Sequence, residues 1–383
     1  MSPERLRFWC PAFFDDRSVP VALFDGVFHL RQYHYRHQYQ RQRPGSLRQA
    51  LADANDGDTI TFAVSGTITL TSGEPLVNRS INISGPGADN LVVDGNAASR
   101  VFHINSGKTV TISGLTITNG SDVNGGGILN DQGTLTIASS TISNNVAIIS
   151  GGGGISNDRA ALIIANSTIS DNSAIVGGGI RNFAFDGPTS VVISNSTLSN
   201  NAAPLSGGGG VSNSGAMATM QISNSTFSDN SALGGGSIAN GSNATLVLSN
   251  NVLKAGKSGG NIVNDPGSTL ISGGYNISSD NGGGLLTGPG DQINTDPMIG
   301  PLQNNGGPTF THALLPGSPA IDAGDPTFTP PPLYDQRGPG FDRVVNGRID
   351  IGSFEVQTPT PPCVGRCSPT PRPRPTPRPR PTP

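Results

Sequence analysis

Gly152–Asn172 has the sequence GGGISNDRAALIIANSTISDN, and the same skeleton recurs through the middle of the chain. Its first half joins a glycine run to an Ile-x-Asn triplet, and this half recurs with small changes at Gly125–Asn130, Gly177–Asn182, Gly208–Asn213, Gly235–Asn240 and Gly259–Asn264. Its second half alternates apolar and polar residues, and it recurs at Thr109–Gly120, Thr134–Asn145, Ser190–Asn201, Thr219–Asn230 and Thr245–Gly256. The chain is therefore built from a repeat.

The spacing and the inner pattern of the copies indicate the fold. Successive Ile or Val residues of the Ile-x-Asn triplets are 27, 25, 31, 27 and 24 residues apart, and a period in the twenties is typical of a solenoid. Within one copy, Leu135 and Ile137 alternate with Thr136, which is the period-2 pattern of a strand. Each copy offers three such strands. The sequence therefore predicts an all-β, right-handed parallel β-helix with three strands per coil and about eight to nine coils.

Stacking of the coils predicts columns of like residues, roughly 4.8 Å apart. One apolar column is Ile112, Ile137, Ile164, Ile193, Ile222 and Leu248. A second is Ile117, Ile142, Ile169, Leu198, Phe227 and Leu253. A polar column is Asn130, Asn157, Asn182, Asn213, Asn240 and Asn264, whose amides are expected to hydrogen-bond along the stack.

Composition excludes several function classes. Charged residues make up 13% of the 383 residues, well below the roughly 25% of typical soluble chains. Residues 44–356 carry 22 acidic against 11 basic residues, so no nucleic-acid partner is expected. No apolar run reaches the roughly 18 residues of a transmembrane helix. The cysteines Cys10, Cys363 and Cys367 lie outside the repeats, so the solenoid needs no disulfides.

The chain is expected to have five parts: 1–43, 44–57, 58–278, 279–356 and 357–383. The first is expected to be a disordered leader, or an extension upstream of the natural start, and no secretory signal is recognisable in it. The second holds a capping helix over 46–54, since Ser46 and Gln49 form a capping-box pattern. Residues 58–278 form the β-helix, and 279–356 a C-terminal cap of loops and last strands.

The tail, residues 357–383, has proline at nearly every second position. Such a segment is expected to be disordered and extended. It suits a stiff spacer better than a ligand for a proline-binding domain. Cys363 and Cys367 either pair or serve as an anchor, and their spacing leaves both open.

Three segments carry a resemblance to a known family. Ser46–Ile60 (SLRQALADANDGDTI), the GGGI-x-N coils and Asp350–Glu355 (DIGSFE) resemble bacterial surface proteins of the choice-of-anchor Q type, with similarity to chlamydial polymorphic outer-membrane-protein repeats. The resemblance implies a pectate-lyase-like β-helix, export, and attachment at the cell surface or release outside the cell. It brings no catalytic residues with it.

Polysaccharide lyases and hydrolases also use this fold, so some residues of the chain are candidates for catalysis. Asp171 and Asp229 are expected in one column two coils apart, at roughly 9.6 Å, close to the spacing of paired glycosidase carboxylates. Asn200 lies between them, however, which favours a corner where Asp and Asn interchange. Arg159 and Arg181 are neighbours by repeat, and they are the candidates for a lyase base.

Calcium is the one cofactor that the sequence suggests. Acidic residues gather near the C-terminus, and oxygen ligands from loops suit Ca²⁺. The candidates are Asp322, Asp325, Asp335, Asp342 and Asp350. Turn-forming aspartate is the alternative interpretation.

These observations favour a non-enzymatic, adhesin-like protein, expected to be monomeric, whose polar solenoid face contacts carbohydrate or another extracellular surface or cell-envelope partner. The alternative is a polysaccharide-active lyase or glycoside hydrolase, or a catalytically dead relative. A purely structural envelope component is a third interpretation.

Overall fold

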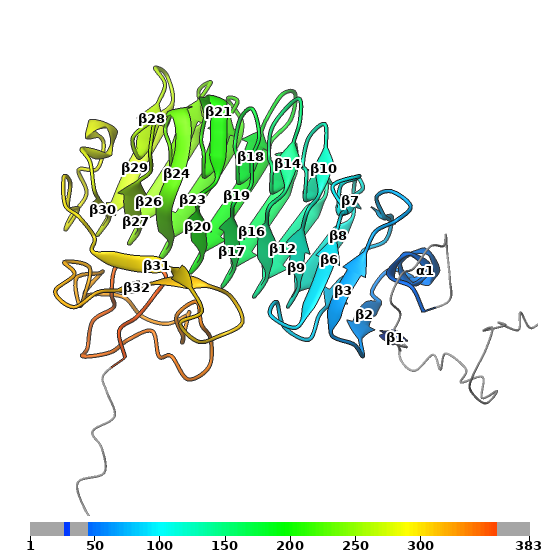
Figure 1. Ribbon diagram of the computed structural model, residues 1–383. Coiled ribbons are helices and arrows are strands. Elements are labelled where there is room, and N and C mark those ends of the chain that lie inside the picture. The colour runs from blue at the N-terminus through cyan, green and yellow to red at the C-terminus, as the bar shows by residue number, and fades with distance from the viewer. Residues whose placement is uncertain (1–26, 31–44, 358–383) are drawn as a thin grey trace, which may run out of the picture.

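The computed structural model describes residues 27–30 and 45–357. The predicted tail beyond Gln357, most of the predicted leader and all three cysteines lie outside these residues. The described chain is a parallel β-helix, as the repeat predicts (Figure 1). It passes in turn through three parallel sheets, which we call A, B and C.

Sheet A contains β1 (Val27–Leu30), β2 (Thr59–Phe62), β5 (Asn82–Ser84), β8 (Thr109–Ser113), β12 (Thr134–Ala138), β16 (Ala161–Ala165), β19 (Thr189–Ser194), β23 (Ala218–Ser223), β26 (Thr245–Ser249) and β29 (Thr269–Gly274). Sheet B contains β3 (Gly66–Thr69), β6 (Leu91–Asp94), β9 (Thr116–Thr118), β13 (Thr141–Ser143), β17 (Thr168–Ser170), β20 (Thr197–Ser199), β24 (Thr226–Gly234), β27 (Val252–Ala255) and β30 (Ile277–Ser278), and β21 (Ala202–Gly207) pairs with β24. Sheet C contains β4 (Leu76–Val77), β7 (Phe102–Ile104), β11 (Ile128–Asp131), β15 (Ile155–Asp158), β18 (Ile180–Phe183), β22 (Val211–Ser214), β25 (Ile238–Gly241) and β28 (Ile262–Asn264). The short strands β10 (Ser121–Asp122) and β14 (Val146–Ala147) pair at a corner.

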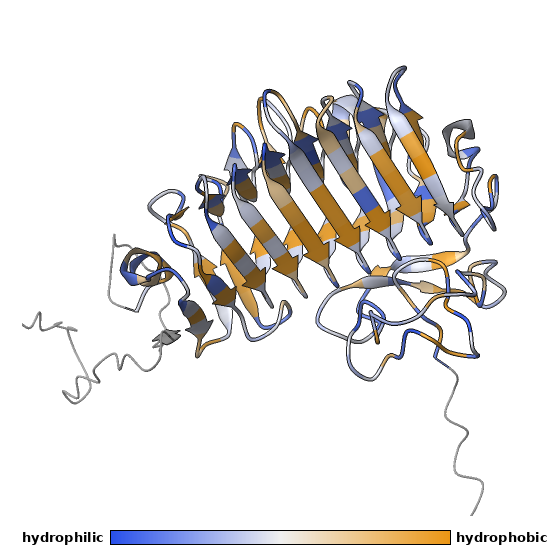
Figure 2. Cartoon of the chain, turned by 180° about the vertical axis from the view of Figure 1, so that it is seen from behind, coloured by the Kyte–Doolittle hydropathy of each residue, from blue (hydrophilic) through white to orange (hydrophobic). Residues whose placement is uncertain are grey.

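Strand register confirms both apolar columns. Ile137 pairs with Ile112 on one side and Ile164 on the other, and the column continues to Leu248. Ile142 likewise stands between Ile117 and Ile169. These side chains are fully buried, and Figure 2 shows apolar rows crossing successive strands. They belong to the main core, which runs through the coils.

Each corner of the coil carries its own polar ladder. The predicted column is confirmed: each amide from Asn130 to Asn240 donates to the side-chain oxygen of the asparagine in the next coil, at 2.7–2.9 Å. Two further ladders also join successive coils through side-chain hydrogen bonds. Asn145, Asn172, Asn201 and Asn230 line the corner after sheet B, and Ser140, Ser167, Ser196 and Ser225 line the turn between sheets A and B. Each ladder thus pairs buried polar groups of one coil with those of the next.

The glycine run makes a very tight corner. Gly152 has φ of 73°, a left-handed conformation that costs glycine little. A Cβ on Gly154 would lie 2.6 Å from the carbonyl oxygen of Gly179 in the next coil. The run therefore sets how closely the corners stack.

The N-terminal end is closed by α1 (Leu47–Asp53). The Ser46 side chain accepts from the backbone N–H of Gln49 and caps the helix, and Leu47, Ala50 and Leu51 are buried in the core. β1 lies within the segment predicted as a disordered leader, and it pairs with β2. The edge of β2 offers the backbone hydrogen-bonding groups that this four-residue strand uses.

Beyond β30 the chain first covers the C-terminal end of the core and then packs against sheet B. The turn η1 (Gly282–Gly284) lies against Ile262 and brings Leu286 into the core. From residue 299 the chain runs back along the outside of sheet B, beneath β17 to β27 in Figure 1. We call residues 299–356 the lateral segment. It contains the antiparallel pair β31 (Ile299–Gln303) and β32 (Thr311–Leu314).

The lateral segment packs on a row of hydroxyls. The Thr168 hydroxyl donates to the carbonyl of Phe310 at 2.6 Å, and that of Thr197 donates to the Gln336 side chain at 2.6 Å. An apolar cluster beside this row joins Val252 and Ile277 of the solenoid to Ile299, Leu314, Ala320, Ile351 and Phe354. The outer face of sheet B is therefore partly interior.

Candidate functional site

The two carboxylates Asp171 and Asp229 lie at corners of sheet B, in the same column as Asn144 and Asn200. All four residues have φ between 55° and 58°, a left-handed conformation that Asn and Asp adopt more readily than most residues. Asn200 donates to Asp171 at 2.5 Å, and the Ser228 hydroxyl donates to Asp229 at 2.6 Å. Each carboxylate thus has a local partner, which supports their interpretation as corner residues.

Arg159 and Arg181 lie in adjacent coils and have separate partners. Arg159 is at a corner with φ of 52°, and it contacts Asp186 at 3.1 Å and Asp131 at 3.7 Å. Arg181 projects from sheet C, 3.4 Å from Asp158, with its guanidinium 4.0 Å from the centre of the Phe183 ring. Burial lowers the pKa of Arg181, and Asp158 opposes this shift. The two arginines thus belong to separate ion pairs.

The five calcium candidates do not converge. Across residues 27–30 and 45–357, no group of three or more His, Cys, Asp or Glu side chains is arranged to hold a metal ion. Asp335 is buried and binds Arg337 at 2.5 Å. Asp350 accepts from the backbone N–H groups of Asp322 and Val356. Asp342 is exposed. The buried members of the set hold the lateral segment together.

A buried charge cluster lies inside the lateral segment. The Arg343 side chain is fully buried, 3.9 Å from Glu355, and it donates to the carbonyls of Asp350 and Gly352. Burial, followed by the neighbouring Asp350, raises the pKa of Glu355 to about 8. Burial also raises the pKa of Asp350. Two guanidinium groups, Arg337 and Arg343, thus lie among three carboxyl groups, those of Asp335, Asp350 and Glu355.

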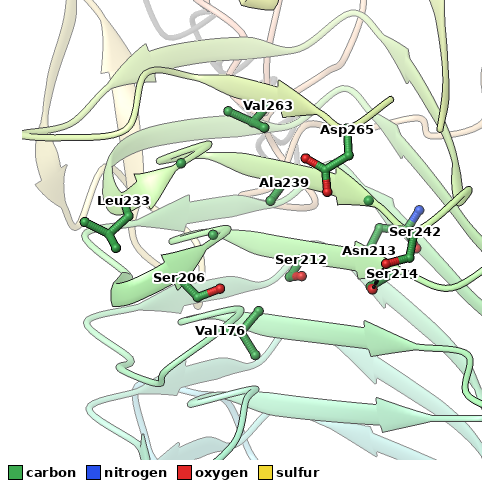
Figure 3. Close-up of a pocket in the computed structure, with 13 residues that line it drawn as sticks. Val176, Ser206, Ser212, Asn213, Ser214, Leu233, Ala239, Ser242, Val263 and Asp265 are labelled. Carbon is green, nitrogen blue, oxygen red and sulfur yellow. Dashed lines mark hydrogen bonds between the residues drawn. The ribbon is translucent and has the colours of Figure 1, made fainter. Parts of the chain in front are cut away.

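A groove of about 430 Å³ crosses the outer face of sheet C. Ser212 and Ala239 lie between its sides, Leu233 and Ser206 stand on one side, and Asp265 on the other (Figure 3). The remaining lining residues are Val176, Gly207, Asn213, Ser214, Gly234, Gly241, Ser242 and Val263. Hydroxyls, small residues and aliphatic side chains dominate, with one carboxylate.

The groove exists because outward side chains shrink from one coil to the next. Arg181 is in register with Ser212, which is in register with Ala239. Phe183 is in register with Ser214, which is in register with Gly241. The large pair on β18 therefore forms one end of a depression. The sequence holds this signal in the residues that point outward on sheet C. The predicted apolar columns and the asparagine column point inward, and they do not reveal the groove.

Comparisons with known proteins add a distant structural match. No family model matches the chain, and no curated protein matches it. Among solved structures the chain is similar to the crystal structure of pectate lyase Pel9A, with a TM-score of 0.41 and 18% identity, over 82% of this chain and 91% of that chain. No helix within residues 27–30 and 45–357 is long and apolar enough to span a membrane.

Proposed function

We propose that the chain is a non-enzymatic cell-surface or secreted β-helix protein of the choice-of-anchor Q type, which contacts carbohydrate or another surface through the outer face of sheet C. The observation that carries the proposal is the composition of the groove. It offers hydroxyls, amides and aliphatic side chains on a rigid stack of strands, which is the chemistry of a binding site. The family assignment is supported by the three resembling segments.

The test is a glycan array probed with the purified full-length chain, together with an assay for released sugar products. Binding without product is the expected result. Release of product would contradict the non-enzymatic part of the proposal. Absence of binding to any glycan or cell surface would contradict the binding part and favour a purely structural role.

A polysaccharide-active enzyme is the second candidate, and Arg181 is the observation that favours it. A lyase needs a basic side chain near its substrate, and burial lowers the pKa of this guanidinium. In this case Arg181→Gln would abolish product formation from acidic polysaccharides. Asp171→Ala tests the glycosidase variant in the same assay on acidic and neutral polysaccharides. Loss of an activity in either variant would favour the enzyme.

A further inference from the structure

The groove on sheet C has features that define a ligand class. We propose that it binds an uncharged sugar chain, with the Asp265 carboxylate and the hydroxyls of Ser206 and Ser212 as its hydrogen-bonding groups. The inference rests on the proposed function, because it names the ligand of that binding face.

The first support is unused hydrogen-bonding capacity. Within residues 27–30 and 45–357, the side-chain oxygens of Asp265, Ser206 and Ser212 bond no other protein group. Ser212 is only 5% exposed as a whole residue, but its hydroxyl lines the groove and stays open to it. By contrast, the neighbouring Ser214 donates to the Ser242 hydroxyl at 3.2 Å. The three unpaired residues face one space, so a ligand rich in hydroxyls satisfies them together.

The second support is the aliphatic part of the groove lining. Leu233 is 73% exposed and Val263 is 36% exposed, and Val176 lines the same groove. Exposed large aliphatic side chains beside a polar floor are typical of binding grooves. A pyranose ring presents C–H groups on its faces and hydroxyls at its edges. The aliphatic side chains suit the C–H faces of the ring. The oxygens of Asp265, Ser206 and Ser212 suit its hydroxyl edges.

The negative charge of the groove favours neutral sugars over acidic ones. Asp265 is the one titratable side chain that lines the groove, and residues 44–356 carry 22 acidic against 11 basic residues. The carboxylates of a polyuronate would lie near Asp265 and within this negative field, where like charges repel. A neutral sugar instead donates its hydroxyls to Asp265, and hydrogen bonds to a charged acceptor are the stronger kind.

The small side chains at the floor set the depth. A Cβ on Gly241 would lie 2.5 Å from the Asp265 carboxylate, so Gly241 keeps that side chain accessible. Ser214 occupies the column position that Phe183 fills one coil earlier. Because the solenoid already accommodates phenylalanine in this column, Ser214→Phe fills the groove with little expected effect on the fold.

The experiment is titration calorimetry of the full-length protein with cellohexaose, mannohexaose, hexagalacturonate and the chitosan hexamer, with sugar release monitored in parallel. At least one neutral hexaose is expected to bind more tightly than both charged oligomers. Ser214→Phe and Asp265→Asn are each expected to weaken that binding about tenfold or more. Gln221→Val is the control, since its register partners on sheet A are Val192 and Val247, and it should leave binding unchanged.

Tighter binding of hexagalacturonate or of the chitosan hexamer overturns the ligand class but leaves the binding function standing. Binding of neither neutral hexaose overturns the inference, as does unchanged affinity in both groove variants when their thermal midpoints match that of the unaltered protein. Release of sugar products would instead contradict the proposed non-enzymatic function, irrespective of which oligomer binds.

Discussion

Side-chain amides specify the corners of this solenoid. Asn201 is buried, and it donates to Asn230 at 2.9 Å and accepts from Asn172 at 2.9 Å. Its neighbour Asn200 is exposed and bonds an exposed carboxylate. The repeat makes both residues asparagine, so the sequence pattern alone does not separate the ladder from the surface. Burial separates them.

Asn201→Ala is expected to destabilise the fold by about 2–4 kcal/mol, since each buried group left unpaired costs roughly 1–3 kcal/mol. Asn200→Gly, which keeps the left-handed backbone accessible, is the control and is expected to change stability by less than about 1 kcal/mol. Thermal unfolding followed by circular dichroism provides the measurement. Equal effects of the two changes would argue against the ladder as a source of stability.

At the scale of elements, predictability follows from repetition. The inward columns and the first ladder could be predicted because each coil repeats the same inward pattern, as Ile137, Ile164 and Ile193 do. The lateral segment could not be placed in this way. Its anchors have no repeat, and their partners are distant in the sequence: Gln336 contacts a residue 168 positions away, and His312 one 113 positions away. The groove, by contrast, could be predicted in principle from the sizes of the side chains that point outward on sheet C.

Glu355 makes the lateral segment sensitive to alkali. Its folded-state pKa of about 8 lies above its ordinary value of 4.5, so its contribution to stability is complete below pH 4.5 and is lost as the pH rises to about 8. Hydrogen exchange at β31 and β32, corrected for intrinsic rates, is therefore expected to accelerate between about pH 6 and about pH 9. Glu355→Gln should remove this acceleration. If the variant keeps it, another group is responsible.

His312 makes the same segment sensitive to acid. Its Nε2 lies 3.0 Å from the Ser199 hydroxyl and its Nδ1 lies 2.7 Å from the carbonyl of Gly300. Burial lowers its pKa below 6.5, and the Gly300 carbonyl and Asp229 oppose the shift while Lys254 adds to it. Its contribution is thus present above pH 6.5 and is lost as the pH falls through the folded-state pKa.

Exchange at β32 is accordingly expected to accelerate as the pH falls below 6.5 and through the lowered folded-state pKa of His312. His312→Gln, which has no group titrating in this range, should show a flat profile there. A profile identical to that of the unaltered protein would show that His312 does not couple the segment to pH.

For the whole molecule, stability comes from contacts between adjacent coils, as expected of a solenoid. Ile193 is fully buried in the central stack, whereas Ile163, one coil earlier on sheet A, is 42% exposed. Ile193→Ala is expected to cost about 2–5 kcal/mol and Ile163→Ala less than about 1 kcal/mol. Urea unfolding monitored by circular dichroism measures both. Similar costs would contradict the inward and outward assignment on this sheet.

The lateral segment also fixes the number of coils between its points of attachment to the solenoid. It bonds asparagines at three heights of the stack: Thr309 contacts Asn166, Tyr334 contacts Asn195, and Asp350 contacts Asn250. The span from the first height to the last is three coil steps, roughly 14 Å. Duplication or loss of a coil within this span would break the match to the segment, whereas these three contacts do not extend to the coils on the N-terminal side of β13. Variation in repeat number among descendants of this chain is therefore expected on the N-terminal side, with the measured span kept constant.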